Sequence, residues 1–339
     1  MPDTLARVRD WAGQPVTETP LKGGLSHRIS RVDAADGRRW LLRILDPRVS
    51  AAGLGIPLEQ EIANTERAAE AGVGPRVLHR MPGALLLEYL DGVTLDAPAV
   101  RELPEPITAA CRRLHAGPRF AGDFSVFRKL EQFLALCREH GLRTPDGYED
   151  VLPAAAEIER ALAARPLPSV PCHNDLLPAN LIRCGTEVRI VDYQLSGNGD
   201  PAFELGDIAA EAEYDPDLTA RLARAYFGED DPRLTARVRL NLIMSNITWT
   251  LWFSVHHGLL REQAAAADFD YEAEAAGKFA RAVRDLGDPG FGRLIDDVRG
   301  PRPGPVARGP HPGPATPRIT QGGLYDRTGP GGRGRETTR

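Results

Sequence analysis

Three polar residues in the middle of the chain have the types and spacing that a phosphate-transfer site needs. Asp175 and Asn180 lie five residues apart, and Asp192 follows Asn180 by twelve residues, after the apolar segment Glu187–Val191. In phosphoryl transfer, one carboxylate accepts the proton of the attacking hydroxyl, while oxygen ligands hold Mg²⁺ on the phosphates of ATP. We therefore predict Asp175 and Asn180 as catalytic residues, with Asp175 as the general base, and Asn180 and Asp192 as Mg²⁺ ligands.

A structural explanation of the same residues is that Asp175 and Asn180 cap a helix that begins near Pro178. This explanation accounts for polar residues in one loop. It does not account for a further carboxylate, Asp192, at the end of an apolar strand. We favour the catalytic interpretation because it explains the three residues together.

Composition and charge limit the class of protein. The chain is 42% hydrophobic and 26% charged, which is typical of a globular protein. Residues 301–339 contain eight prolines and nine glycines and carry a net charge of +5, which leaves −10 on residues 1–300. An acidic body argues against nucleic acid as a partner. We expect the tail to be disordered, either as a basic arm for acidic partners or as a solvated extension.

Targeting signals and cysteines indicate the compartment. No apolar run approaches the roughly 20 residues of a membrane span, and the N-terminus lacks the apolar core of a signal peptide. The cysteines have no metal-ligand spacing, so we expect reduced, mostly buried thiols in a cytoplasmic protein. The sequence makes no prediction of the oligomeric state. The four cysteines are Cys111, Cys137, Cys172 and Cys184.

Hydrophobic periodicity divides the chain into a strand-rich first part and a helical second part. The first part reads as three strands, one helix and a hairpin, and the second is mostly helical from Leu95 onward. The expected strands are 16–22, 27–33, 38–45, 76–79, 84–89 and 187–191. The expected helices are 58–71, 106–116, 124–140, 153–164, 217–226, 232–258 and 271–286.

The segment His173–Asn180 has the spacing H-x-D-x-x-x-x-N of the protein-kinase catalytic loop, with Asn174 where protein kinases have arginine. His173–Ile182 and Val191–Asp215 resemble the choline/ethanolamine kinase family, which belongs with the aminoglycoside phosphotransferases. The resemblance runs from about residue 23 to residue 286. It implies an α+β, two-lobed protein-kinase-like fold, with a small, mainly antiparallel β lobe containing one helix and a larger, mostly helical lobe.

The same resemblance implies three regions along the chain. Residues 1–91 would form the N-terminal nucleotide-binding lobe, and residues 92–300 the C-terminal catalytic and substrate-binding lobe. Residues 301–339 would be the Pro/Gly/Arg-rich tail.

The nucleotide site that the resemblance implies comes mainly from the first region. The turn 23–26 would cover the phosphates, Arg43 would reach them and pair with Glu61, and the hinge backbone at 88–90 would hold adenine. Simpler explanations are an ordinary turn and two solvated surface charges. We favour the pair, because an unpaired guanidinium in an apolar strand would be costly. The implied residues are Gly23, Gly24, Ser26, Arg43, Glu61, Glu88 and Leu90.

The acceptor site implied by the resemblance combines aromatic faces and carboxylates, which hold a cationic alcohol through cation–π and charge attraction. Gln194, His256 and Glu274 depart from the pattern of the family and suit a primary amine, an amino alcohol or a sugar. Trp249 and Trp252 are three residues apart on one helix face, and packing in the core is an alternative role for them. The implied residues are Glu211, Tyr214, Trp249, Trp252 and Tyr271.

We therefore expect an ATP- and Mg²⁺-dependent phosphotransferase that acts on a small cationic alcohol such as choline or ethanolamine. One alternative keeps the fold and changes the acceptor to an aminoglycoside, a sugar or a homoserine-type alcohol. A further alternative is a nucleotide-binding pseudokinase. The joint presence of Asp175, Asn180 and Asp192 argues against the pseudokinase.

Overall fold

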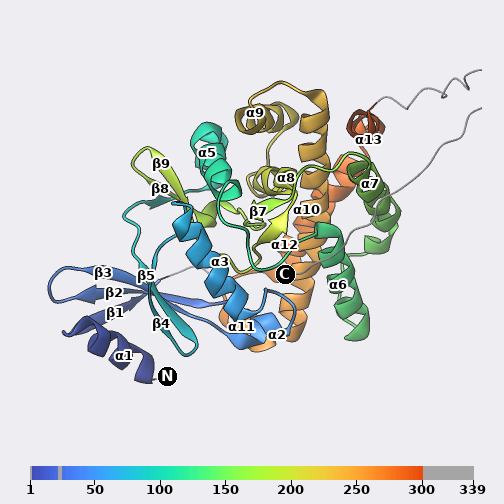
Figure 1. The fold of residues 1–339 in the computed structure, drawn as a ribbon. Coiled ribbons are helices and arrows are strands. Elements are labelled where there is room, and N and C mark those ends of the chain that lie inside the picture. The colour runs from blue at the N-terminus through green and yellow to red at the C-terminus, as the bar shows by residue number, and fades with distance from the viewer. Residues whose placement is uncertain (1, 22–24, 301–339) are drawn as a thin grey trace, which may run out of the picture. The chain divides into compact units, whose positions relative to one another are not determined.

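The computed structural model describes residues 2–21 and 25–300, which lie in one compact unit (Figure 1). The predictions for Gly23, Gly24 and the tail 301–339 concern residues outside this description. Within the described part, no helix combines the length and the apolarity that crossing a membrane requires.

An antiparallel five-stranded sheet forms the first part of the chain, with the strand order β1-β2-β3-β5-β4. Alternation along β3 decides what each face carries, because successive side chains point to opposite sides. Trp40 and Leu42 pack with Val8, whereas Arg43 lies opposite Leu85 on the other face. The strands are β1 (Val16–Pro20), β2 (Arg28–Ala34), β3 (Arg39–Ile44), β4 (Val77–Met81) and β5 (Ala84–Glu88).

Three helices accompany this sheet, whereas the sequence predicts one. The predicted helix is α3 (Leu58–Glu70), whose Ile62 packs against Leu85 on the face of the sheet that also carries Arg43. The other two were not predicted. They are α1 (Pro2–Ala12), in which Val8 is the buried residue among those described, and α2 (Pro47–Ala51), which is too short to show a helical period.

Small antiparallel pairings frame the polar motif. His173 directly follows β7, Asn180 ends the 3₁₀ turn η2, and Asp192 comes two residues after β9. The motif residues therefore stand at the ends of short strands rather than inside regular elements. The elements are β6 (Val93–Thr94), β7 (Val170–Cys172), η2 (Pro178–Asn180), β8 (Leu181–Cys184), β9 (Glu187–Ile190) and β10 (Gly197–Gly199).

The helical part packs around one long helix, α10, which α6, α8, α12 and α13 contact (Figure 1). Most of α10 between Leu234 and His256 is buried because it has neighbours on several sides. The helices are α4 (Ala97–Glu102), α5 (Pro104–His115), α6 (Val126–Glu139), α7 (Leu152–Ala164), α8 (Pro201–Glu211), α9 (Pro216–Phe227), α10 (Pro232–Leu259), α11 (Arg261–Ala266), α12 (Tyr271–Leu286) and α13 (Phe291–Arg299).

The predicted α+β class is confirmed, and the predicted long elements occur within a few residues of their expected bounds. The helix α8 was not predicted. Every residue from Pro201 to Ala210 is buried, so α8 has no polar face to produce a helical period. The four cysteines are free thiols, as expected, and three of them are buried.

A glycine allows α8 and α10 to approach closely. A Cβ added at Gly206 would lie 2.6 Å from the backbone nitrogen of Leu242 and 2.7 Å from the carbonyl carbon of Asn241. Both atoms belong to the backbone of α10, so they cannot rotate away. The separation of the two helices therefore depends on the missing side chain.

We expect Gly206→Ala to lower the free energy of unfolding by about 1–3 kcal/mol, because the new methyl group forces two packed backbones apart. Urea unfolding measured by circular dichroism checks this value.

The matched control is Gly277→Ala in α12, where the nearest atom to an added Cβ is the end of the Arg281 side chain at 3.6 Å. This variant should be more stable than wild type by up to about 1 kcal/mol, since alanine favours helix over glycine. Equal effects at both positions would contradict the close-approach argument.

Candidate active site

His173 connects the two acids of the motif. Its Nε2 donates to the carbonyl of Val191 at 2.8 Å, and its Nδ1 accepts from the backbone N–H of Asp175 at 3.2 Å. Burial lowers the pKa of His173, so the ring is neutral and matches the tautomer that these partners require. The histidine therefore fixes the backbone next to Asp192 and at Asp175 together.

A buried carboxylate holds the loop that begins at His173. Glu204 of α8 accepts the backbone N–H groups of His173 and Asn174 at 2.9 and 2.7 Å. Burial opposes its ionisation, but the His115 ring and these donors outweigh that effect and lower the pKa of Glu204. Asn174 adds two bonds from its own amide, to the carbonyls of Cys172 and Leu195.

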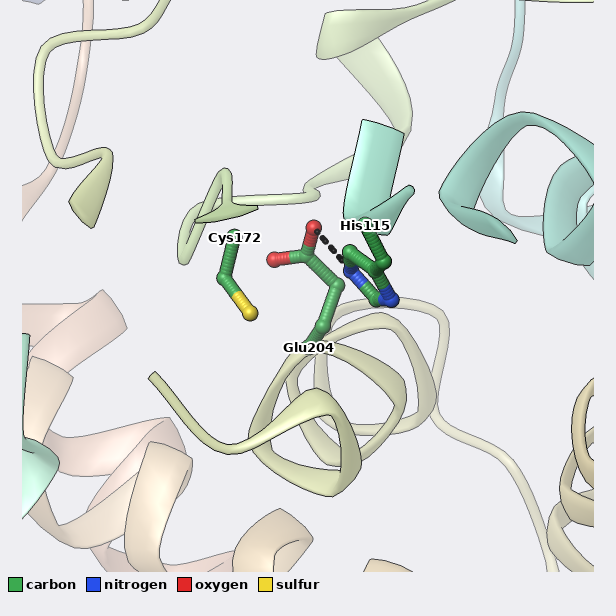
Figure 2. A group of neighbouring side chains, drawn as sticks. All are labelled: His115, Cys172 and Glu204. Atoms are coloured by element: carbon green, nitrogen blue, oxygen red, sulfur yellow. Dashed lines mark hydrogen bonds and ion pairs between the residues drawn. The ribbon is translucent and has the colours of Figure 1, made fainter. Parts of the chain in front are cut away.

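His115, Cys172 and Glu204 form a compact buried group whose ligand atoms lie within 4.8 Å of one another (Figure 2). Such a set has the chemistry of a metal site, but its atoms already have partners. Glu204 binds the loop amides, and the two ring nitrogens of His115 contact Glu204 and the hydroxyl of Tyr226. The group therefore supports the loop that begins at His173.

Backbone strain occurs at two motif positions. Asn174 and Asp192 have φ values of 66° and 71°, in the left-handed region that side chains other than Asn and Asp rarely adopt. Such conformations persist only where surrounding contacts hold them. Here Glu204 and His173 supply those contacts.

The helix-cap explanation of Asp175 and Asn180 does not hold. The element that begins at Pro178 is one 3₁₀ turn, and no side chain caps it. Instead, the Asn180 amide donates to the carbonyl of Asp175 at 2.8 Å. Its carboxamide oxygen is thus the atom available to a metal.

Arg43 joins the sheet to the motif. Its Nη2 donates to Glu61 at 2.9 Å, which forms the predicted pair, and to Asp192 at 2.5 Å. His27 lies 3.3 Å from the other oxygen of Glu61. Burial alone would raise the pKa of Asp192, but the Arg43 guanidinium lowers it to about 2. Arg43 lines the cavity and Glu61 does not. Glu61 therefore orients the Arg43 guanidinium from outside the cavity.

One cavity of about 660 Å³ is lined from both parts of the chain. On the side of the sheet its lining includes the apolar side chains of Leu21, Ile29 and Leu41 and the segment 88–90, which is the predicted hinge. The Glu88 carboxylate accepts a hydrogen bond from the backbone N–H of Arg76, which holds the segment 88–90 against the residues before β4. The predicted site residues that line this cavity are Ser26, Arg43, Glu88, Leu90, Asp175, Asn180, Asp192, Glu211, Trp249 and Trp252.

The acceptor side has an aromatic wall with two ion pairs. Trp249, Trp252, Phe253 and Phe269 line it, and Phe253 and Phe269 stack with ring centroids 5.6 Å apart. The indole N–H groups of Trp249 and Trp252 bond to Asp207 and to the Leu54 carbonyl, so both tryptophans pack and line the cavity.

Two positively charged side chains near this wall were not predicted from the sequence. Lys278 of α12 is 2% exposed, lines the cavity and donates to Glu211 at 2.6 Å. Glu274, also in the wall, pairs with Arg281. The sequence does contain a signal for Lys278. It lies three residues after Ala275, on the buried side of an amphipathic helix.

Two predicted acceptor residues lie elsewhere. The chain reverses at Glu213, whose φ is 53°, and the Tyr214 hydroxyl then donates to the Val100 carbonyl at 2.7 Å. Tyr271 stands behind the wall, stacked on His256 with centroids 4.7 Å apart. Neither tyrosine lines the cavity.

Several carboxyl groups lie close to Asp175. Burial, reinforced by the carboxylates of Asp207, Asp192 and Glu211, raises the pKa of Asp175 well above its usual range. Burial and Glu211 also raise the pKa of Asp207 to about 7. Lys278 offsets these increases only in part. A cation bound beside these carboxyl groups would therefore stabilise their ionised forms.

Comparison with known proteins places this site in a family. Residues 17–239 match the phosphotransferase enzyme family. Thiamine kinase of Salmonella paratyphi B is 30% identical over 172 residues, which cover 50% of this chain and 59% of that enzyme. Protein LicA of Haemophilus influenzae is 27% identical over 256 residues, 70% of this chain and 73% of LicA.

A solved structure extends the likeness to the whole described fold. The choline/ethanolamine kinase family protein of Mesorhizobium loti has a TM-score of 0.74 and 31% identity, covering 88% of this chain and 98% of that protein. The resemblance stated from the motifs is thus confirmed. The chain belongs to the phosphotransferase enzyme family, in the part of it that contains the choline/ethanolamine kinases.

Proposed function

We propose that this protein transfers the terminal phosphoryl group of ATP to the hydroxyl of a small cationic alcohol such as choline or ethanolamine. The observation that carries the proposal is one cavity that holds Asp175, Asn180 and Asp192 together with Arg43 and an aromatic wall. We place this activity in the cytoplasm, in keeping with the free cysteines.

The nucleotide would occupy the apolar side of the cavity. Adenine needs a flat apolar slot with backbone groups at its edge, which Leu41, Ile182 and the hinge 88–90 provide. Arg43 is buried, and its Nε has no hydrogen-bond partner among the described residues. A guanidinium held on one side by Glu61 with donors to spare suits the phosphates.

The residues present also fit Mg²⁺. Asp192 supplies a carboxylate and Asn180 a carboxamide oxygen, and the backbone N–H of Val191 donates to the Asn180 carbonyl at 3.0 Å, which keeps the two ligands close. One carboxylate, one amide oxygen and nucleotide phosphates form the donor set that Mg²⁺ prefers. When bound, the ion would neutralise charge on the phosphates.

Asp175 would receive the proton of the acceptor hydroxyl and orient its oxygen. The raised pKa of Asp175 makes its carboxylate a better proton acceptor than an exposed one. His173, Asn180 and Glu204 fix the loop before substrate binds. Catalysis in this scheme rests on position and charge, as phosphoryl transfer requires.

A cationic acceptor is supported by electrostatics and by the relatives. Burial and neighbouring carboxylates raise the pKa values of Asp175 and Asp207, and Lys278 offsets this only in part, so a bound cation would stabilise their ionised forms. Phe253, Phe269 and the two tryptophans offer faces for a quaternary or primary ammonium. Thiamine and choline, which appear in the names of the relatives, are both alcohols with a positively charged nitrogen.

One observation favours a second candidate, an oxygen-rich acceptor such as a sugar or a homoserine-type alcohol. The ammonium of Lys278 has three donors, and Glu211 is its one hydrogen-bond partner among the described residues. Its remaining donors could bind acceptor oxygens. A panel of choline, ethanolamine, thiamine, homoserine, an aminoglycoside and simple sugars, assayed for ATP-dependent phosphorylation, separates the two candidates.

We expect Asp175→Asn to lower kcat by a factor of at least about 100 and to leave ATP binding intact, because the amide cannot accept the hydroxyl proton. Turnover and nucleotide affinity are measured on the same preparation. Asp217→Asn, the same change at an exposed position in the first turn of α9, should alter neither quantity. Wild-type turnover by Asp175→Asn would exclude it as the base.

We expect Phe269→Ala to raise the KM for choline by about 2- to 30-fold, the range that corresponds to one lost cation–π contact. The KM for the neutral isostere, in which carbon replaces the nitrogen of choline, should rise less. The two acceptors are compared by steady-state kinetics at saturating ATP.

Val283→Ala is the matched control for this comparison. Val283 is another exposed hydrophobic residue, but it lies outside the cavity, so neither KM should change. An equal rise in both KM values for Phe269→Ala would mean that the ring contributes apolar contact without recognising charge.

A further inference from the structure

We propose that Asp207 is a positioning residue that holds the base-bearing loop and the acceptor wall in one fixed relation. The inference rests on the proposed phosphotransferase function. Asp207 lies in α8, is fully buried and does not line the cavity, so it would act through the residues that it binds.

The two carboxylate oxygens of Asp207 face different parts of the site. Oδ2 accepts the backbone N–H of Leu176, the residue after Asp175, at 2.7 Å. Oδ1 accepts the Ser245 hydroxyl at 2.8 Å and the Trp249 indole N–H at 2.7 Å. One side chain thus connects the catalytic loop to α10.

Both connections end on a group that the proposed reaction uses. Fixing the amide of Leu176 restricts the peptide plane next to Asp175, and so the direction in which its carboxylate points. Trp249 belongs to the aromatic wall of the cavity. Asp207 therefore sets the distance between the proton acceptor and the surface on which the acceptor alcohol rests.

Stability alone is a poor reason for a carboxylate here. Asp207 has no ion-pair partner within the described part of the chain, and it lies near the negative charges of Asp175 and Glu211. Burying such a group is costly even with hydrogen bonds. A carboxylate is, however, the side chain that accepts on both oxygens at once.

Asparagine tests this point, because it keeps the size of the side chain but can accept on only one oxygen. In Asp207→Asn, the amide group either faces the N–H of Leu176 or faces Ser245 and Trp249, and one connection is lost. We expect kcat to fall by about 100-fold, the scale of a misplacement of about 1 Å, with the KM for ATP unchanged.

Ser245→Ala is the matched control. It removes one donor to Oδ1 and keeps both the loop connection and the indole connection, so its kcat should stay close to that of wild type. The kinetics are normalised to the folded fraction measured by circular dichroism. A kcat for Asp207→Asn equal to that of Ser245→Ala overturns the proposal, as does a matching loss of ATP affinity.

If Asp207→Asn does not fold, a second variant decides. Ser245→Ala with Trp249→Phe removes both donors on α10 and keeps the carboxylate, with a smaller aromatic ring at position 249. The proposal expects a kcat below that of Trp249→Phe alone at unchanged KM for ATP, because only the double variant loses the whole connection to α10. A kcat equal to that of Trp249→Phe alone overturns it. Failure of the proposed function is distinct, because wild type would then phosphorylate no alcohol of the panel.

Discussion

The capture of loop amides by a buried carboxylate is the interaction on which the site depends. The left-handed φ of Asn174 takes the loop out of any regular element, so its N–H groups cannot pair within a strand or helix. Glu204 accepts two of them, and its charge is tolerable in the core because His115 and these donors surround it. The helix that carries Glu204 must therefore be buried, and Gly206 lets α10 cover it.

A second constraint joins the sheet to this loop. Arg43 lies in β3, and its guanidinium binds both Glu61 of α3 and Asp192 of the motif. A buried arginine needs such partners, so its pairing ties the two parts of the chain together where the phosphates would lie. Gln194 adds a bond to Ser26, and the His256 ring a bond to the Leu25 carbonyl. Two of the residues that depart from the family pattern thus serve contacts between the two parts of the chain.

The sequence predicted what local spacing and local composition determine. The spacing of Asp175, Asn180 and Asp192 is local, and the apolar strand around Arg43 favoured its pairing with Glu61. Glu204, Asp207 and Lys278 were not among the predicted residues, because the partners that they bind are 30 or more residues away. For Glu204 and Asp207, α8 also lacks a polar face that would have revealed the helix. Tyr214 does not line the cavity, and the left-handed φ of Glu213 that precedes it cannot be read from the composition of the segment.

The distribution of charge in the acceptor side bears on the shape of the substrate. Glu211 is paired with Lys278 and Glu274 with Arg281, whereas Asp175 and Asp207 have no ion-pair partner within the described residues. Burial and neighbouring carboxylates raise the pKa values of these two groups, so they are the ones whose ionised forms a bound cation would stabilise most. For the proposed reaction, a cationic alcohol gains most when its nitrogen lies a few bonds from the reacting hydroxyl, because both groups must then be close to Asp175. Choline and ethanolamine have that short spacer, and a long polyamine alcohol would place its other charges against residues that are already paired.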